Sequence, residues 1–126
     1  MERPRPPLHE FGRLCSDRQQ IIDAVAPDDN FNIICIQESH GCQAALDCLH
    51  TRWPQWLWSG SFLNSAAGGV ITGIGPMISK HVPVVVDRVV VPGRVLISTI
   101  CVKDAHLEVA NVHLVPGITS SVFQSQ

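Results

Sequence analysis

The stretch Phe31-Asn32-Ile33-Ile34-Cys35-Ile36-Gln37-Glu38-Ser39-His40 decides the fold of this chain. Its central run, Ile33–Ile36, is apolar on both faces, which is typical of a strand buried between two layers. Polar residues follow, so the strand leaves the core at the edge of a sheet, where ligands tend to bind in α/β folds. A carboxylate held by a rigid strand suits Mg²⁺ or Ca²⁺, which prefer charged oxygen. Glu38 is therefore the first candidate site residue.

The chain has 126 residues, of which 45% are hydrophobic and 16% charged, so it can bury the core of one domain. The formal net charge of −2 gives no overall basic field for nucleic acid, although a local basic patch is compatible with it. Residues 1–13 are rich in Pro and Arg and are expected to form an extended lead-in. Residues 14–117 are the expected domain, and residues 118–126 a polar tail.

Five cysteines, at positions 15, 35, 42, 48 and 101, are an odd number without regular spacing, which favours a reduced, intracellular protein over a disulfide scaffold. Cys35 and Cys101 lie in strand-like runs, where buried cysteine behaves as a small hydrophobic residue, so both are expected to be buried. The N-terminus lacks the apolar segment of a signal peptide. No uncharged apolar stretch reaches the ~18 residues of a transmembrane helix, so no membrane span is expected.

Two helices and a series of strands are predicted from the pattern of apolar residues. Ser16-Asp17-Arg18-Gln19 matches a capping box, and it predicts a helix that ends at Pro27. A second helix, with Ser39 as a candidate cap and Pro54 at its end, is predicted by the helical spacing of Cys42, Ala45, Leu46 and Leu49. The strand-like segments are, in chain order, Trp56–Trp58, Gly68–Ile74, Val84–Val91, Arg94–Val102 and His106–Leu114.

The predicted fold class is therefore α/β, with a mixed, largely antiparallel sheet and flanking helices. Pro92-Gly93 fits the central positions of a type II turn, so the last strands form adjacent hairpins. A sheet that is apolar on both faces needs cover on both sides, and the two predicted helices are too few to supply it. We expect the chain to be part of a larger domain.

The second candidate site is Asn111-Val112-His113-Leu114. Because side chains alternate along a strand, Asn111 and His113 point to the same face, where they can donate hydrogen bonds to an anion such as a phosphate oxygen. Ordinary structural interpretations stay open for both candidates. Glu38 can be a strand-end carboxylate facing solvent, and the Asn111/His113 pair can lie on a solvated face.

Other site chemistries fit the sequence less well. His40, Cys42, Cys48 and His50 are soft-metal ligand types, but Cys42 and Cys48 are six positions apart, about 240° around a helix, and cannot converge on one ion. Cys42 is the nearest candidate for a Cys–His nucleophile, although it lies at no obvious activating helix N-terminus. The glycines from Gly68 to Gly75 lack the strand–loop–helix context and the Lys-Ser/Thr of a phosphate-binding loop.

Taken together, these segments resemble the metal-dependent endonuclease/exonuclease/phosphatase superfamily over roughly residues 14–117. The resemblance is carried by Ile33–His40, Gly68-Gly69-Val70, Pro92-Gly93-Arg94-Val95 and Asn111-Val112-His113-Leu114. The Gln-Glu-Ser-His-Gly end of the first segment looks most like the endonuclease domain of non-LTR retroelements. The poly(A)-nuclease and sphingomyelinase-like branches stay open as alternatives.

The resemblance implies a four-layer α/β sandwich and the hydrolysis of a phosphodiester. DNA is the favoured substrate, and RNA, a phospholipid and an inositol phosphate stay open as alternatives. It implies Mg²⁺ or Mn²⁺ at Glu38, where the ion would stabilise charge on the phosphate. His113 would be the catalytic residue that hydrogen-bonds the scissile phosphate. Gln37 would support the metal ligand, and Asn111 would hold the end of its strand in place.

The chain departs from the family pattern at three motifs. No metal-site Asn precedes the first predicted helix, where His9-Glu10-Phe11-Gly12-Arg13 stands instead. The later Gly-Asp-X-Asn and Ser-Asp-His motifs are missing, and Asp28-Asp29-Asn30 lies before the Glu38 strand, in the position of a turn. A single carboxylate is a poor Mg²⁺ site. We therefore expect an N-terminal half of the domain, inactive alone. The alternatives are a non-catalytic remnant or binding module of the same fold, and an unrelated α/β domain.

Overall fold

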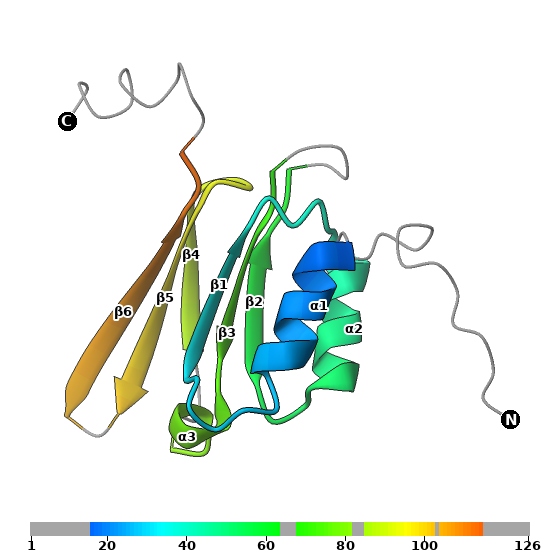
Figure 1. Cartoon of the computed structure of the whole chain (residues 1–126). Helices are drawn as coiled ribbons and strands as arrows, with labels where there is room; N and C mark the ends of the chain where they lie inside the picture. Colours follow the sequence, from blue (N-terminus) through cyan, green and yellow to red (C-terminus); the bar gives the residue numbers. More distant parts are fainter. Residues whose placement is uncertain (1–15, 64–67, 82–84, 103, 115–126) are drawn as a thin grey trace, which may run out of the picture.

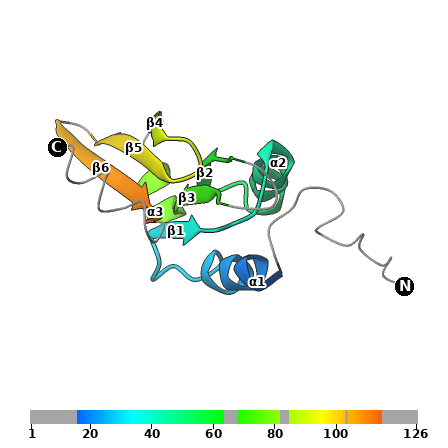
Figure 2. The same cartoon turned by 90° about the horizontal axis from the view of Figure 1, so that it is seen from above.

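The computed structural model describes residues 16–63, 68–81, 85–102 and 104–114. These residues form three layers: a pair of helices, a first sheet and a second sheet (Figures 1 and 2). The elements are α1 (Ser16–Val25), β1 (Ile33–Gln37), α2 (Gln43–Arg52), β2 (Leu57–Ser61), β3 (Val70–Ile74), α3 (Pro76–Ser79), β4 (Val85–Val91), β5 (Val95–Val102) and β6 (Ala105–Val112). The predicted lead-in 1–13 and polar tail 118–126 lie outside the described residues.

The first sheet has the strand order β1-β3-β2, and both strand pairs are antiparallel. Its outer face packs against α1 and α2 because the helices and strands all present apolar residues to the same layer (Figure 2). The fully buried members of this core include Ile22 of α1, Leu49 of α2 and Ile71 of β3. The predicted strand is β1, at an edge of this sheet, with Ile34 and Ile36 buried on the helix side rather than both faces buried as expected. The candidate Glu38 follows directly after it.

The second sheet is the predicted meander, with the order β4-β5-β6 and antiparallel pairing throughout. Gly93 has a φ of +70°, and the Arg94 amide donates a 2.9 Å hydrogen bond to the Val91 carbonyl. This is the geometry of a type II turn, which requires a positive φ at its third residue. The turn predicted at Pro92-Gly93 is confirmed.

The two sheets pack face to face, and the contact changes character along its length. At one end Ile74 and Ile100 form a buried apolar cluster. Towards the other end, buried polar residues join the apolar Val70 and Leu96: Ser59, Ser61 and Thr72 from the first sheet, and Ser98 and Asn111 from the second. Buried polar groups are kept in a core only when they are hydrogen-bonded, so this end adds specific polar contacts to apolar burial.

The predicted α/β class with flanking helices is confirmed, and the sheet arrangement is more regular than expected. We expected a mixed, largely antiparallel sheet, and the described strands form two three-stranded sheets that are each fully antiparallel. Both helices cover the first sheet only (Figure 2). The second sheet therefore exposes large apolar side chains: Val86, Val89, Val90, Val91, Leu107 and Val112.

Three local expectations need correction. Cys35 and Cys101 lie on strands, as predicted, but both side chains are exposed. Ser39 does not cap α2, whose N-cap residue is Cys42 without a side-chain cap. Ser39 is instead fully buried, and its hydroxyl accepts a hydrogen bond from the Gly41 amide. The short helix α3 was not predicted, since it spans only four residues.

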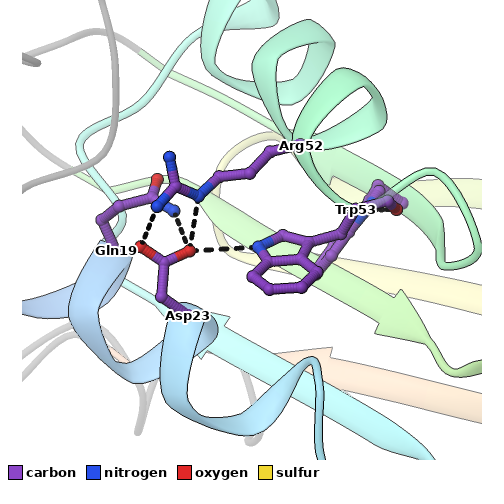
Figure 3. A network of polar contacts seen from close by, with 5 residues as sticks. Gln19, Asp23, Arg52 and Trp53 are labelled. Carbon is purple, nitrogen blue, oxygen red and sulfur yellow. Dashed lines mark hydrogen bonds and ion pairs between the residues drawn. The ribbon is translucent and has the colours of Figure 1, made fainter. Parts of the chain in front are cut away.

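A carboxylate network joins α1 to α2 (Figure 3). Asp23 accepts hydrogen bonds from Gln19 on its own helix and from both the guanidinium of Arg52 and the indole of Trp53. The Arg52 contact is bidentate, at 2.7 and 2.8 Å, which is the strongest geometry for this kind of pair. The network fixes the helices as one layer over the first sheet.

Within the part of the chain that the structure describes, none of the helices has both the length and the apolar character that crossing a membrane requires.

Candidate functional site

The candidate site lies where β1 and β6 end and where β3 and β5 begin. Three turns meet there, and each contains backbone in the left-handed region. The residues with positive φ are Glu38 (50°), His40 (53°), Gly68 (73°), Gly69 (92°) and Gly93 (70°). Left-handed backbone is easy for glycine but costs roughly 1–2 kcal/mol for other residues.

Backbone hydrogen bonds tie these turns to one another. The amides of Ser39 and His40 donate to the carbonyls of Gly69 (3.1 Å) and Gly68 (3.0 Å), respectively. The Gly69 amide in turn donates to the Gly93 carbonyl at 3.0 Å. Gly69 leads into β3 of the first sheet, and Gly93 lies in the turn between β4 and β5 of the second sheet. These hydrogen bonds therefore hold the ends of the two sheets together. The glycines permit this close approach: a Cβ on Gly69 would lie 2.5 Å from the Ser39 hydroxyl.

Asn111 is the buried polar residue that connects the two sheets at this end. Only 1% of it is exposed. Its Nδ2 donates to the Ile71 carbonyl at 2.9 Å and to the Thr72 hydroxyl at 3.1 Å. Its Oδ1 accepts a 2.8 Å hydrogen bond from the Gln37 amide. Gln37 and Asn111, both predicted as supporting residues, are thus in direct contact. Gln37 directly precedes Glu38, and Asn111 lies two positions before His113.

The two principal candidates meet at the surface beyond this pair. Nε2 of His113 lies 3.8 Å from Oε1 of Glu38, although the residues are separated by 75 positions in the sequence. The side chain of His113 is 20% exposed and that of Glu38 is 48% exposed. The period-two prediction holds, because Asn111 and His113 lie on the same side of β6, the side that faces the first sheet.

Arg94 is a site residue that the sequence interpretation missed as an individual side chain. Its Nη1 lies 3.0 Å from Nδ1 of His113. Arg94 and His113 continue the β5–β6 ladder beyond the Val95–Val112 pair, and the His113 amide donates to the Arg94 carbonyl at 2.7 Å. The signal was present in the sequence: extending the β5–β6 pairing one position beyond Val95–Val112, towards the Pro92-Gly93 turn, places Arg94 opposite His113 and on the same face.

Strained backbone at this end is a second sign of function. Glu38 and His40 are the non-glycine residues with positive φ in the described part of the chain, and both follow β1. Such conformations persist only where surrounding contacts impose them, and they cluster at ligand sites. The hydrogen bonds from the Ser39 and His40 amides to the carbonyls of the glycine turn, Gly69 and Gly68, are the contacts that impose the conformation here.

The described residues do not make a complete site for Mg²⁺ or Mn²⁺. Among them no three His, Cys, Asp or Glu side chains come close enough to hold one ion. Glu38 supplies one carboxylate, whereas hard divalent cations need several oxygen ligands. The soft-metal ligand types His40, Cys42, Cys48 and His50 also form no such group.

Gly68, Gly69 and Gly73 allow close packing and backbone hydrogen bonding, and they do not form a phosphate-binding loop. Gly69 donates its amide to a carbonyl of the second sheet, and Gly73 lies within β3 opposite Trp58. A Cβ on Gly68 would lie 3.0 Å from Nη1 of Arg94, so this glycine makes room for the guanidinium.

Comparison of the chain with protein-family models, with curated proteins and with solved structures gave no match in any of the three.

Proposed function

We propose that this chain carries the phosphate-recognition part of a phosphodiesterase site of the nuclease class, with DNA as the favoured substrate. The observation that supports the proposal most directly is the meeting of Glu38 and His113 at 3.8 Å, from strands in different sheets. The resemblance to the endonuclease/exonuclease/phosphatase superfamily implies this pairing, and the sequence interpretation required that both residues face one site.

The side chains at this site match an anionic phosphodiester. Arg94 has a permanent positive charge and several N–H donors, of which one is directed to His113. A histidine N–H next to that guanidinium gives a second donor, so a phosphate oxygen can be bound from two directions. Asn111 and Gln37 hold the strand ends that carry these groups and take no part in binding.

We propose that the chain alone binds its ligand without cleaving it. Glu38 places a negative charge 3.8 Å from His113, and this charge repels a phosphate. The family resemblance assigns Mg²⁺ or Mn²⁺ to Glu38, but the described residues provide too few ligands for such an ion, so the proposal includes no step through the metal.

A non-catalytic binding module of the same fold is the second candidate function. It is favoured by the single carboxylate at the site within the described residues. Both candidates predict binding of a phosphodiester, and only the first predicts cleavage once the missing acidic ligands are supplied.

The binding test is a titration of the full 126-residue chain with a short single-stranded DNA. Binding is measured from the changes in the NMR signals of the His113 and Arg94 side chains. With chelator present, we expect weak binding that is lost in Arg94→Met and His113→Gln and strengthened several-fold in Glu38→Gln. His50→Gln, an exposed position on α2, is the matched control and should bind as the wild type. Unchanged site signals at saturating DNA would refute the proposal.

The cleavage test is plasmid nicking by the same chain with Mg²⁺ and with Mn²⁺. We expect no nicking above that of the Glu38→Ala variant. Metal-dependent nicking that Glu38→Ala abolishes would instead show a complete nuclease and would exclude the binding-module alternative.

A further inference from the structure

We infer that Arg94 is a positioning residue that holds His113 in a single tautomer, with the proton on Nε2. The guanidinium of arginine is only a donor, and it cannot lose its proton in a protein. An N–H of Arg94 at 3.0 Å from Nδ1 of His113 therefore requires a lone pair on that nitrogen. A neutral imidazole has one N–H, which is then on Nε2.

Glu38 supports the same tautomer from the opposite side of the ring. Oε1 of Glu38 lies 3.8 Å from Nε2, beyond hydrogen-bond length but close enough for a strong field. With the proton on Nε2, the positive end of the N–H dipole faces the carboxylate. With the proton on Nδ1, the Nε2 lone pair would face the negative carboxylate, and the Nδ1 proton would face a guanidinium proton.

The fold leaves Arg94 little freedom to turn away from the ring. The backbone of Arg94 accepts the 2.7 Å hydrogen bond from the His113 amide, so the two residues are held directly across the ladder. The side chain of Arg94 lies over Gly68, where the missing Cβ leaves space for the guanidinium. The histidine is accordingly presented as a fixed hydrogen-bond donor.

This tautomer defines the class of ligand. Nε2–H and the other guanidinium N–H groups are donors that bind oxygens carrying no hydrogen, as in a phosphate diester, which competes with the Glu38 carboxylate for Nε2–H. The tautomer itself depends on the Arg94 contact alone, whereas this statement about ligands rests on the proposed function.

The test is a long-range ¹H–¹⁵N NMR spectrum of the ring nitrogens in the full chain, with His113 assigned by the loss of its signals in His113→Gln. We expect Nδ1 of the wild type to resonate as an unprotonated nitrogen and Nε2 as a protonated one. In Arg94→Met the two signals should move towards each other, as in a mixture of tautomers, and Arg94→Lys should keep the wild-type pattern because it retains a cationic donor.

Two results would overturn the inference: a protonated Nδ1 in the wild type, or a folded Arg94→Met variant with unchanged ring signals. The wild-type spectrum decides the matter even if a variant fails to fold. Addition of dimethyl phosphate tests the ligand statement separately, because it should shift Nε2 more than Nδ1. A confirmed tautomer without any phosphate response would contradict the proposed function and leave the tautomer assignment standing.

Discussion

The side-chain amide of Gln37 donates a 2.8 Å hydrogen bond to Oδ1 of Asn111, and this contact joins the end of β1 in the first sheet to the end of β6 in the second. The side-chain amide of Asn111 in turn donates hydrogen bonds to the Ile71 carbonyl and to the Thr72 hydroxyl, both on β3. The two strands that carry Glu38 and His113 are thus connected through one buried side chain.

Replacement of Asn111 by Ala should therefore be strongly destabilising. The change leaves the Ile71 carbonyl and the Thr72 hydroxyl without this buried partner, and we expect a loss of about 3 kcal/mol. Urea unfolding followed by tryptophan fluorescence measures it. Asn32→Ala, at an exposed position, is the control and should change stability by less than about 0.5 kcal/mol. Equal effects of the two substitutions would contradict the assigned role of Asn111.

The left-handed backbone of Glu38 predicts an unusual order of stability among its variants. Glu38→Gly and Glu38→Ala both remove the carboxylate, but only glycine adopts a φ of 50° without strain. We expect Glu38→Gly to be about 1 kcal/mol more stable than Glu38→Ala, the reverse of the order in a regular strand. Thermal unfolding of the pair gives the answer, and a more stable alanine variant would show that the backbone here is unstrained.

The Asp23 network predicts a difference between two aspartates on helices. Asp23→Ala removes the acceptor of Arg52 and Trp53 and should cost about 2 kcal/mol. Asp47, on α2, accepts only from Gln43 of the same helix among the hydrogen bonds to its carboxylate in the described residues, so Asp47→Ala should cost at most about 0.5 kcal/mol. Chemical denaturation of both variants compares them. A cost below 1 kcal/mol for Asp23 would show that the exposed part of the network contributes little.

Two glycines that face the helical layer should respond differently to a methyl group. A Cβ on Gly73 would lie 2.5 Å from Cζ3 of Trp58, a buried and rigid ring, and we expect Gly73→Ala to cost about 2 kcal/mol or more. A Cβ on Gly60 would meet the end of the Phe62 ring, a half-buried side chain that can turn aside. Gly60→Ala should therefore cost less, and thermal unfolding would reveal the order. If Gly60→Ala were the more damaging variant, the packing of Trp58 on Gly73 would need revision.

Cys35 predicts a loss of stability in alkaline solution. Although part of the Cys35 side chain reaches solvent, the neighbouring strand removes enough water from its thiol to raise the pKa, and a hydrogen bond with Thr72 opposes this less strongly. Because the pKa is higher in the folded state, the folded protein holds this proton more tightly than the unfolded chain does. The resulting stabilisation is complete below the pKa of an unfolded cysteine and is lost as the pH rises through the raised value. Denaturation across this range should show a decline that is smaller in Cys35→Ala, and identical slopes would refute the coupling.

Much of the fold follows from local sequence patterns. The type II turn at Pro92-Gly93 and the strands on either side of it were predicted because turn chemistry and period-two alternation are local signals. The residue pattern did not predict the division of the strands into two sheets, which only the family resemblance implied, since it depends on which strand edges meet in the packed protein.

The residues named for the candidate site lie together, and their functional roles stay predictions. Glu38, His113, Gln37 and Asn111 are all at one end of the sheets. The left-handed conformations of Glu38 and His40 could not be predicted, because they are uncommon for residues other than glycine and tertiary contacts impose them. Arg94 was missed because its role depends on a side-chain contact with His113.

The chain of amide-to-carbonyl bonds that runs from the Ser39 turn through Gly69 to Gly93 has a consequence for hydrogen exchange. No one of these turns can open without breaking a bond to the next, so their amide protons should exchange together, as a single cooperative unit. The amides of Ser39, His40 and Gly69 should then share one free energy of opening, although they belong to segments about thirty residues apart in the sequence. Any molecule that binds at this end should slow all of them at once.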